Sequence, residues 1–302
     1  MTGGRAAMLA DLAVRALGAE ARLGPKPGLV DHRGGGAHGD MDLPLMLASA
    51  EALRPVFRSL AVAAQRMAVG SGLRTELGRI GRAGERVMLG ATRGVNTHRG
   101  ALWALGLLVA GAATAADEPS AVGRAARLAA LPDAADAEGA SGSAASPDAD
   151  VPASVLSHGE RVRRRFGVPG ARGEAAAGFP HVVEVALPRL RQGRAAGHAE
   201  DVARLDALLA VMSHLNDTCV LHRGGLAGLR VVRTGAARVL AEGGTGTVPG
   251  RTALAELDER LRAYGLSPGG SGDLLAAALF LDMVPRHGSG AETDREAVSC
   301  RR

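Results

Sequence analysis

Five polar segments of this chain combine glycines with acidic, basic and histidine side chains, the residue types that acid–base and phosphate chemistry use. A connection that only reverses the chain needs one glycine and any solvated residues. If the segments meet at the ends of helices, they form a polar pocket in which helix N-termini suit phosphate binding. Together they predict an active site. The segments are GPKPGLVDHRGGGAHGDMD (24–42), ATRGVNTHRGA (91–101), VPGARGEAAAGFP (168–180), NDTCVLHRGG (216–225) and LSPGGSGDLLA (266–276).

The first segment ends with two aspartates, Asp40 and Asp42, beside His38. Carboxylate oxygens are the ligands that Mg²⁺ prefers, and proteins commonly hold Mg²⁺ by one or two carboxylates plus substrate phosphates. Glu85, in a later helix, is a further candidate metal ligand or base. The alternatives are structural, because either aspartate could cap the following helix and Glu85 could pair with a neighbouring arginine.

The segment NTHRG places polar side chains at the expected start of an apolar helix, with Thr97 as its N-cap. The helix dipole and the free N–H groups there attract phosphate, and the Arg99 guanidinium adds a bidentate donor. His98 could act as an acid or a base because its reference pKa lies near neutrality. A hydrogen-bonded structural histidine is an equal alternative.

Two later segments repeat this mixture at helix starts. In NDTCVLHRGG, the polar side chains are Asp217, His222 and Arg223. In SPGGSGD, Ser271 or Asp273 is the expected cap, and the Gly269–Gly270 backbone is a candidate anion nest. Lys26, the only lysine, lies between two prolines and could meet a phosphate as a point charge. No segment has the GxxxxGK[ST] pattern, so a P-loop is not indicated.

The elements that must position these segments are helices. Because 46% of the residues are hydrophobic but only 2% are aromatic, the core must consist of small aliphatic side chains, and alanine is the best helix former. No run of alternating strands and no repeat is found. We predict an all-α fold, a single domain over 1–302. Helices are expected over 5–22, from 42 onward, and over 74–91, 101–116, 155–166, 174–193, 200–215, 224–241, 251–264 and a last stretch ending near 283.

Two stretches are predicted to lie outside this core. Residues 132–154 are acidic and almost without large apolar groups, which predicts a flexible linker or surface loop. Residues 284–302 are predicted to form a disordered tail.

The charge and cysteine content narrow the partners and the compartment. A net charge of +5 favours anionic partners such as phosphates, although a solvated arginine-rich surface would give the same value. Few aromatic residues are available to stack bases, which argues against single-stranded nucleic acid. Two cysteines without a CxxC pair exclude a disulfide framework. The chain shows no signal peptide and no membrane span, so the cytoplasm is expected.

In these segments the chain resembles the triphosphoribosyl-dephospho-CoA synthases, the enzymes that serve citrate lyase and malonate decarboxylase. The match covers most of residues 20–283 in family order. Four positions depart from the family pattern: Arg99 replaces a usual lysine, Gly84 and Gly272 replace alanines, and Cys219 replaces a common asparagine. The matching motifs are GPKPGLVD (24–31), GAHGDMD (36–42), GVNTHRGA (94–101), HGE (158–160), GARGEA (170–175), GFP (178–180), HRGG (222–225) and SPGGSGDLLA (267–276).

The resemblance implies that the chain joins ATP to 3′-dephospho-CoA, releases adenine and leaves a triphosphoribosyl group on the CoA ribose. The new glycosidic bond is α whereas that of ATP is β, so a single displacement at the anomeric carbon would invert it. The triphosphate then needs Mg²⁺ and cationic donors, and the oxocarbenium-like carbon needs a carboxylate. The attacking hydroxyl needs a base and the departing adenine a proton.

Residue roles follow as hypotheses. Acid–base catalysis is assigned to Asp31, His98 or Asp217, and metal–triphosphate binding to Asp40, Asp42 and Glu85. The expected substrate-binding residues are Lys26, Arg33, Gly35, Gly36, His38, Asn96, Thr97, Arg99, His222, Arg223, Gly224, Ser267, Gly269, Gly270 and Asp273.

Two rival functions stay open at this point. A metal-dependent nucleotide phosphohydrolase or nucleosidase would use the same residues with water as the acceptor. An arginine-rich nucleic-acid binder, suggested by RVRRRF at 161–166, leaves the polar segments unexplained. The sequence does not distinguish the citrate lyase pathway from the malonate decarboxylase pathway. Nor does it define the oligomeric state or show whether the downstream carrier-protein transferase binds this chain.

Overall fold

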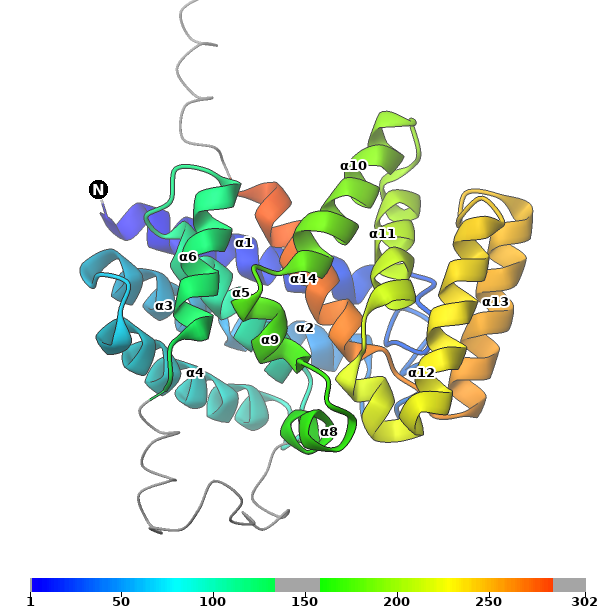
Figure 1. The fold of residues 1–302 in the computed structure, drawn as a ribbon, viewed down its shortest axis with the longest axis horizontal. Helices are drawn as coiled ribbons and strands as arrows, with labels where there is room; N and C mark the ends of the chain where they lie inside the picture. Colours follow the sequence, from blue (N-terminus) through cyan, green and yellow to red (C-terminus); the bar gives the residue numbers. More distant parts are fainter. Residues whose placement is uncertain (1, 134–157, 285–302) are drawn as a thin grey trace, which may run out of the picture.

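The structure, a computed structural model, describes residues 2–133 and 158–284 and confirms the all-α prediction (Figure 1). Within these residues the only extended pairing is an isolated bridge between Asp31 and Gly34. No described helix is long and apolar enough to cross a membrane. The predicted loop 132–154 and tail 284–302 lie outside the described residues, apart from positions 132, 133 and 284. The helices are α1 (Thr2–Arg22), α2 (Leu43–Ala52), α3 (Arg54–Arg66), α4 (Ser71–Ala91), α5 (Arg99–Ala112), α6 (Glu118–Ala130), α8 (His158–Phe166), α9 (Gly170–Ala176), η1 (His181–Ala186), α10 (Leu187–Ala195), α11 (Glu200–His214), α12 (Thr218–Ala241), α13 (Val248–Ala263) and α14 (Gly269–Met283).

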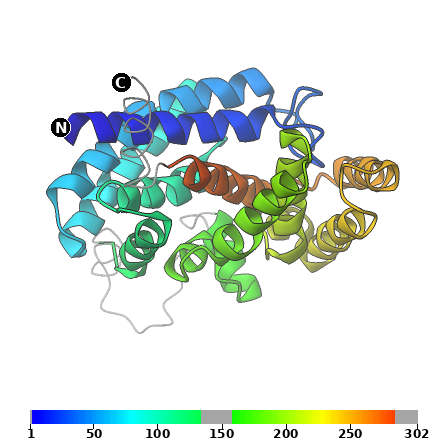
Figure 2. The same ribbon diagram turned by 90° about the horizontal axis from the view of Figure 1, so that it is seen from above.

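Helices α5 and α14 form the centre of the core. Both are apolar on all sides, and their neighbours include α1, α3 and α6 around α5, and α1, α11 and η1 around α14. Figure 2 shows α14 between α1 and the green helices α9 and α10. Small residues allow this close packing: a β-carbon at Gly111 of α5 would collide with the carbonyl oxygen of Ala121 in α6.

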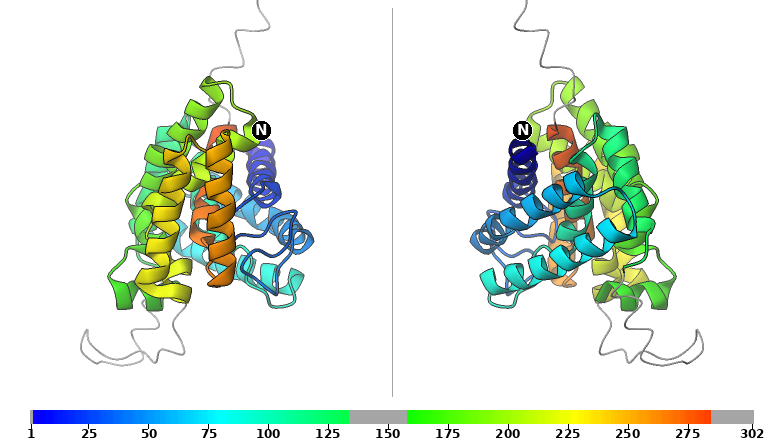
Figure 3. Two further views of the ribbon diagram at one scale, coloured as in Figure 1. Left: turned by 90° about the vertical axis from the view of Figure 1, so that its right-hand side faces the viewer. Right: turned by 90° about the vertical axis from the view of Figure 1, so that its left-hand side faces the viewer.

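Helices α12 and α13 form an antiparallel pair at one end of the molecule, seen side by side in Figure 3. The sequence predicted a helix over 224–241, but α12 begins at Thr218 and is kinked at Gly225. Gly225 has φ 56°, a left-handed conformation that glycine adopts without a steric cost. The kink therefore separates residues 218–224, a short helical segment at the start of α12, from the rest of the helix.

Two other helix predictions were wrong in detail, and one helix was missed. The expected helix over 174–193 is broken after α9 and continues as the π-helical turn η1 and then α10, because Pro180 and the left-handed Phe179 (φ 56°) interrupt it. The long helix from 42 is divided at Leu53, just before Pro55. Helix α6 was not predicted; its N-cap, Asp117, accepts a hydrogen bond from the Ser120 N–H.

Candidate active site

The five polar segments converge on one cavity of about 1430 Å³. Its walls come from the loop after α1, from α4, α5, α8 and α9, and from the first turns of α12 and α14. This volume exceeds the roughly 300–1,000 Å³ that is typical of a site for one small ligand. The predicted site residues that line it are Lys26, His38, Asp40, Glu85, Asn96, Thr97, His98, Arg99, Asp217, His222, Arg223, Ser267, Gly269, Gly270 and Asp273.

Six predicted residues do not line this cavity: Asp31, Arg33, Gly35, Gly36, Asp42 and Gly224. Gly36 (φ 63°) allows the loop to turn back on itself, since a β-carbon there would meet the carbonyl oxygen of Leu29. A β-carbon at Gly224 would meet the Leu266 side chain. These two glycines therefore permit close packing, and their predicted contacts with phosphate have no support in this geometry.

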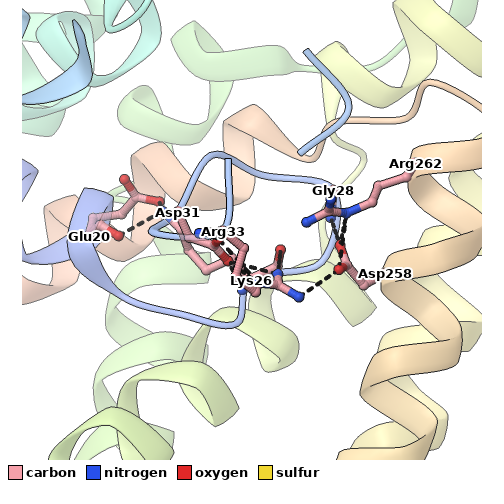
Figure 4. Close-up of polar contacts among 7 residues, drawn as sticks. All are labelled: Glu20, Lys26, Gly28, Asp31, Arg33, Asp258 and Arg262. Atoms are coloured by element: carbon pink, nitrogen blue, oxygen red, sulfur yellow. Dashed lines mark hydrogen bonds and ion pairs between the residues drawn. The ribbon is translucent and has the colours of Figure 1, made fainter. Parts of the chain in front are cut away.

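The loop that carries Lys26 is held against α13 by a network of carboxylates and arginines (Figure 4). Asp258 of α13 accepts hydrogen bonds from the Gly28 N–H (2.9 Å) and from Arg33 Nη1 (2.8 Å). Asp31 accepts from the Lys26 N–H (2.8 Å) and from Arg33 Nη2 (2.7 Å). Sequence reasoning missed Asp258, which looks like an ordinary charge in an amphipathic helix.

The Asp31 carboxylate is thus hydrogen-bonded to residues of its own loop. Burial by itself would raise the pKa of this carboxyl, but hydrogen bonds from Arg33 and from the Lys26 N–H outweigh burial and lower the pKa. The carboxylate is 1% exposed and both of its oxygens accept hydrogen bonds. Its predicted part in acid–base catalysis stays a prediction, and the structure gives it a contact set suited to holding the loop.

Lys26 is buried and paired with a residue that sequence reasoning missed. Its Nζ donates to Glu20 Oε1 (2.6 Å) and to the Glu20 carbonyl oxygen (2.7 Å) at the end of α1. The two side chains are 1% and 8% exposed. Lys26 therefore lines the cavity with its charge already neutralised by Glu20.

His98 presents one ring nitrogen without a partner. Its Nδ1 bonds Ser49 Oγ (2.9 Å), which in turn bonds Thr97 Oγ1 (2.6 Å), whereas the buried Nε2 has no hydrogen-bond partner in the described chain. Thr97 is thus not the N-cap of α5; His98 occupies that position without a side-chain cap bond. Burial and the nearby charge of Lys26 lower the pKa of His98 to about 4.

We expect His98 to make the stability of the protein depend on pH. Because its pKa is about 4 in the folded chain and about 6.5 when unfolded, the unfolded state binds more protons between these values. The free energy of unfolding therefore has its full value above about pH 6.5. It falls as the pH drops towards 4, and the loss is about 2 kcal/mol at pH 5. Urea titrations at pH 7 and pH 5 would measure this loss. A His98→Gln variant that loses as much stability as the parent would contradict it.

The first turn of α14 gathers three carboxyl groups. Asp217, the N-cap of α12, accepts hydrogen bonds from the Ser271 N–H (2.8 Å) and Ser271 Oγ (3.0 Å), and packs against Gly270. Glu20 Oε1 lies 3.0 Å from where a β-carbon of Gly272 would stand. The third carboxyl group, that of Asp273, extends from this turn to the start of α5.

Asp273 was a predicted cap of its own helix, α14, but the structure shows no side-chain cap bond there. Its carboxyl group accepts a hydrogen bond from the Ala101 N–H and lies so close to Gly100 that a β-carbon there would collide with it. Burial, and then the charges of Glu20 and Asp217, raise the pKa of Asp273 well above its usual range. Burial also raises the pKa of Asp217, although its hydrogen bonds from Ser271 act in the opposite direction.

These contacts correct two predictions about phosphate. The start of α5 and the Gly269–Gly270 backbone were expected to bind phosphate through free N–H groups. The structure places the carboxyl groups of Asp273 and Asp217 at these positions instead. A phosphate would have to displace an aspartate from either of them.

At the cavity rim, His38 connects the first loop to α12 and to the start of α14. Its Nε2 bonds Ser267 Oγ (2.8 Å), and its Nδ1 lies 3.1 Å from Arg223 Nη2. Burial, and then the charge of Arg223, lower the pKa of His38. His38 is therefore neutral at physiological pH.

The three predicted metal ligands are not brought together. Asp42 accepts from the Leu45 N–H (2.8 Å) and caps α2, the alternative stated above. Glu85 pairs with Arg99 (3.1 Å), and the Asp40 side chain is 65% exposed. In residues 2–133 and 158–284, no group of three or more His, Cys, Asp or Glu side chains is arranged to hold a metal ion.

Sequence reasoning predicted Arg99 but missed the other arginines of this part of the cavity wall, and a histidine–glutamate pair beside them. His181 Nδ1 lies 2.7 Å from Glu174 Oε2, and this contact raises the pKa of His181. Their signal was present, since Glu174 belongs to GARGEA and His181 follows GFP. The arginines of this wall are Arg74, Arg82, Arg99, Arg161, Arg163 and Arg172.

The described part of the chain is an all-helical fold around one large polar cavity, whose wall carries paired cations and protonatable carboxyl groups. Residues 6–291 match the family of ATP:dephospho-CoA triphosphoribosyl transferases. The chain belongs to this family and is a transferase.

Known relatives agree with this assignment. A protein of Pseudomonas paraeruginosa, named a probable 2-(5″-triphosphoribosyl)-3′-dephosphocoenzyme-A synthase, is 55% identical over 92% of this chain and 90% of its own length. A protein of the same name from Azotobacter vinelandii is 54% identical over 91% and 90%. The crystal structure of an Archaeoglobus fulgidus protein, titled a "putative triphosphoribosyl-dephospho-coA synthase", shares the fold. Its TM-score is 0.51, and it is 20% identical, covering 80% of this chain and 99% of that one.

Proposed function

We propose that this chain joins ATP to 3′-dephospho-CoA, forming 2′-(5″-triphosphoribosyl)-3′-dephospho-CoA and releasing adenine. Membership of the family carries this proposal, and a cavity large enough for two nucleotides supports it. In the reaction, the bond between the ribose of ATP and adenine breaks and its electron pair leaves with adenine. The CoA hydroxyl oxygen forms the new bond, and the proton of that hydroxyl is balanced by the one that adenine gains.

Among the groups predicted to move these protons, His98 is the most available. Its Nε2 is free of partners in the described chain and belongs to a residue of the cavity wall. A neutral imidazole can accept a hydrogen bond from a substrate hydroxyl or donate one, depending on which nitrogen carries the proton. Ser49, buried at 0% exposure, orients this ring through Nδ1.

We further propose that Mg²⁺ enters with the triphosphate of ATP. Mg²⁺ is usually bound through one or two carboxylates plus substrate phosphates, so a cage made only of protein side chains is not required. Asp40 or Glu85, each of which lines the cavity, would supply the protein carboxylate. The metal would neutralise phosphate charge and orient the chain of phosphates.

Asp40→Asn tests this role. We expect the variant to remain folded, since this exposed carboxylate makes no hydrogen bond to the backbone in the described chain, and to lose most of its turnover. The requirement for Mg²⁺ should shift to higher concentration. Steady-state adenine release, measured across a Mg²⁺ titration, checks both; near-normal turnover would remove Asp40 from the mechanism. Asp42→Asn is the matched control, because an asparagine still caps α2.

The proposed reaction has a direct test. Purified protein is incubated with ATP, Mg²⁺ and dephospho-CoA, and free adenine and the product mass are followed. Adenine release that depends on dephospho-CoA, together with a triphosphoribosyl adduct, is the expected result. Release of phosphate, or of adenine without the adduct, would favour a hydrolase.

The use of the product is a finer proposal. We propose that it becomes the prosthetic group of the acyl carrier protein of malonate decarboxylase or citrate lyase, by way of a carrier-protein transferase. Both pathways stay open, as does direct contact with that transferase. The cytoplasm likewise stays the predicted compartment.

A further inference from the structure

Two parts of the cavity wall differ in charge. Around the first turn of α14 stand Glu20, Asp217 and Asp273, with Lys26 as the cation that pairs with Glu20. We call this group the acidic end. Six arginines of α4, α5, α8 and α9 line another part of the wall together with three carboxylates, those of Glu85, Asp133 and Glu174. We call these arginines, numbered above, the arginine wall.

The charge of the acidic end is unsuited to a triphosphate. The helix N-termini that meet there, those of α12, α14 and α5, already hold Asp217 or Asp273. A phosphate would have to displace one of these carboxyl groups from its N–H donor. The ammonium group of Lys26 is already paired with the Glu20 carboxylate, at 2.6 Å.

The carboxyl groups of the acidic end suit a substrate that develops positive charge. When the bond between ribose and adenine breaks, the anomeric carbon gains oxocarbenium character, which nearby carboxylates stabilise. His98, which lines the same cavity, is 2% exposed and has an Nε2 without a partner in the described chain. A buried polar atom of this kind costs stability unless a ligand satisfies it. A hydroxyl of a bound ribose would do so.

We propose, resting on the proposed function, that ATP binds with its ribose–adenine bond at the acidic end and its triphosphate against the arginine wall. Arg82 and Arg99 are paired at 2.9 Å and 3.1 Å with single carboxylates, and their side chains are 45% and 42% exposed, so each keeps donors for phosphate oxygens. Arg163 of α8 adds an exposed cation to the same wall. Asp273 is then a catalytic carboxyl group at the reacting carbon.

Binding of inorganic tripolyphosphate, measured by calorimetry, tests this orientation apart from turnover. We expect Arg82→Gln, Arg99→Gln and Arg163→Gln each to weaken tripolyphosphate binding about tenfold. Arg79→Gln is the matched control, because Arg79 lies on α4, pairs with Glu76 and does not line the cavity. Asp273→Asn should change this affinity by less than about threefold yet lower kcat at least about 100-fold.

Three results would overturn the orientation: no binding of tripolyphosphate to the parent protein, unchanged binding in all three arginine variants, or binding strengthened about tenfold by Asp273→Asn. If the proposed function failed, the parent protein would release no adenine in the presence of dephospho-CoA. That failure is seen in a different assay, so the two are separable. Thermal unfolding of each variant confirms that the compared proteins are folded.

Discussion

Replacing Lys26 with methionine is expected to lower the free energy of unfolding by about 3–5 kcal/mol. The ammonium group is 1% exposed and holds both the carboxylate and the carbonyl oxygen of Glu20. Without it, a buried carboxylate is left uncompensated, which costs far more than the loss of an exposed pair. Urea unfolding at pH 7 measures the change. Because a domain has only about 5–15 kcal/mol of stability, the variant should be marginal at 37 °C.

A double variant distinguishes the loss of the charge pair from the loss of packing. Lys26→Met combined with Glu20→Gln removes both charges, and we expect it to recover much of the lost stability. Arg79→Gln breaks the exposed pair with Glu76 and should cost less than about 1 kcal/mol. If the single and double variants were equally unstable, packing of the lysine stem would be responsible.

Gly100→Ala is expected to lower kcat by about 100-fold or more while leaving the protein folded. Its new β-carbon would collide with Asp273 Oδ2, so the carboxyl group must leave the start of α5. A shift of about 1 Å in a catalytic group is enough for a loss of this size. Steady-state adenine release, beside thermal unfolding, measures both effects.

Gly123→Ala provides the matched control. Gly123 lies within α6, and a β-carbon there would have no neighbour within 4 Å. We expect this variant to gain about 0.5–1 kcal/mol of stability and to keep full activity. Full activity of Gly100→Ala would show that the position of Asp273 does not matter for turnover.

The sequence predicted the fold class and the members of the cavity wall better than their roles. Apolar helices and glycine-rich connections are local properties, so they can be read from spacing. The resemblance in the polar segments then led to the correct family. Which helix receives a given carboxyl group is a tertiary property. Asp273 illustrates this, because a cap for α14 is the natural local interpretation and yet its acceptor contact is with the Ala101 N–H.

The same limit explains the residues that were missed. Glu20, Ser49 and Asp258 lie in helices whose sequences show nothing unusual. Ser49 and Asp258 gain importance through partners far along the chain, and Glu20 through the buried Lys26 of the next loop. Asp258, for example, holds a loop 230 residues away. The predicted metal ligand Asp42 is a different case, because the sequence already offered helix capping as the alternative. Asp42 caps α2.

The core of this protein is almost without aromatic residues, and its single tryptophan, Trp103, lies in the cavity wall. The indole Nε1 donates to the Ala171 carbonyl oxygen (3.3 Å), and the Arg74 guanidinium lies 5.2 Å from the ring centroid. The tryptophan emission of the chain therefore arises at the arginine wall. Ligands that engage this wall should change its intensity or wavelength, so substrate titrations can be followed by fluorescence on unlabelled protein.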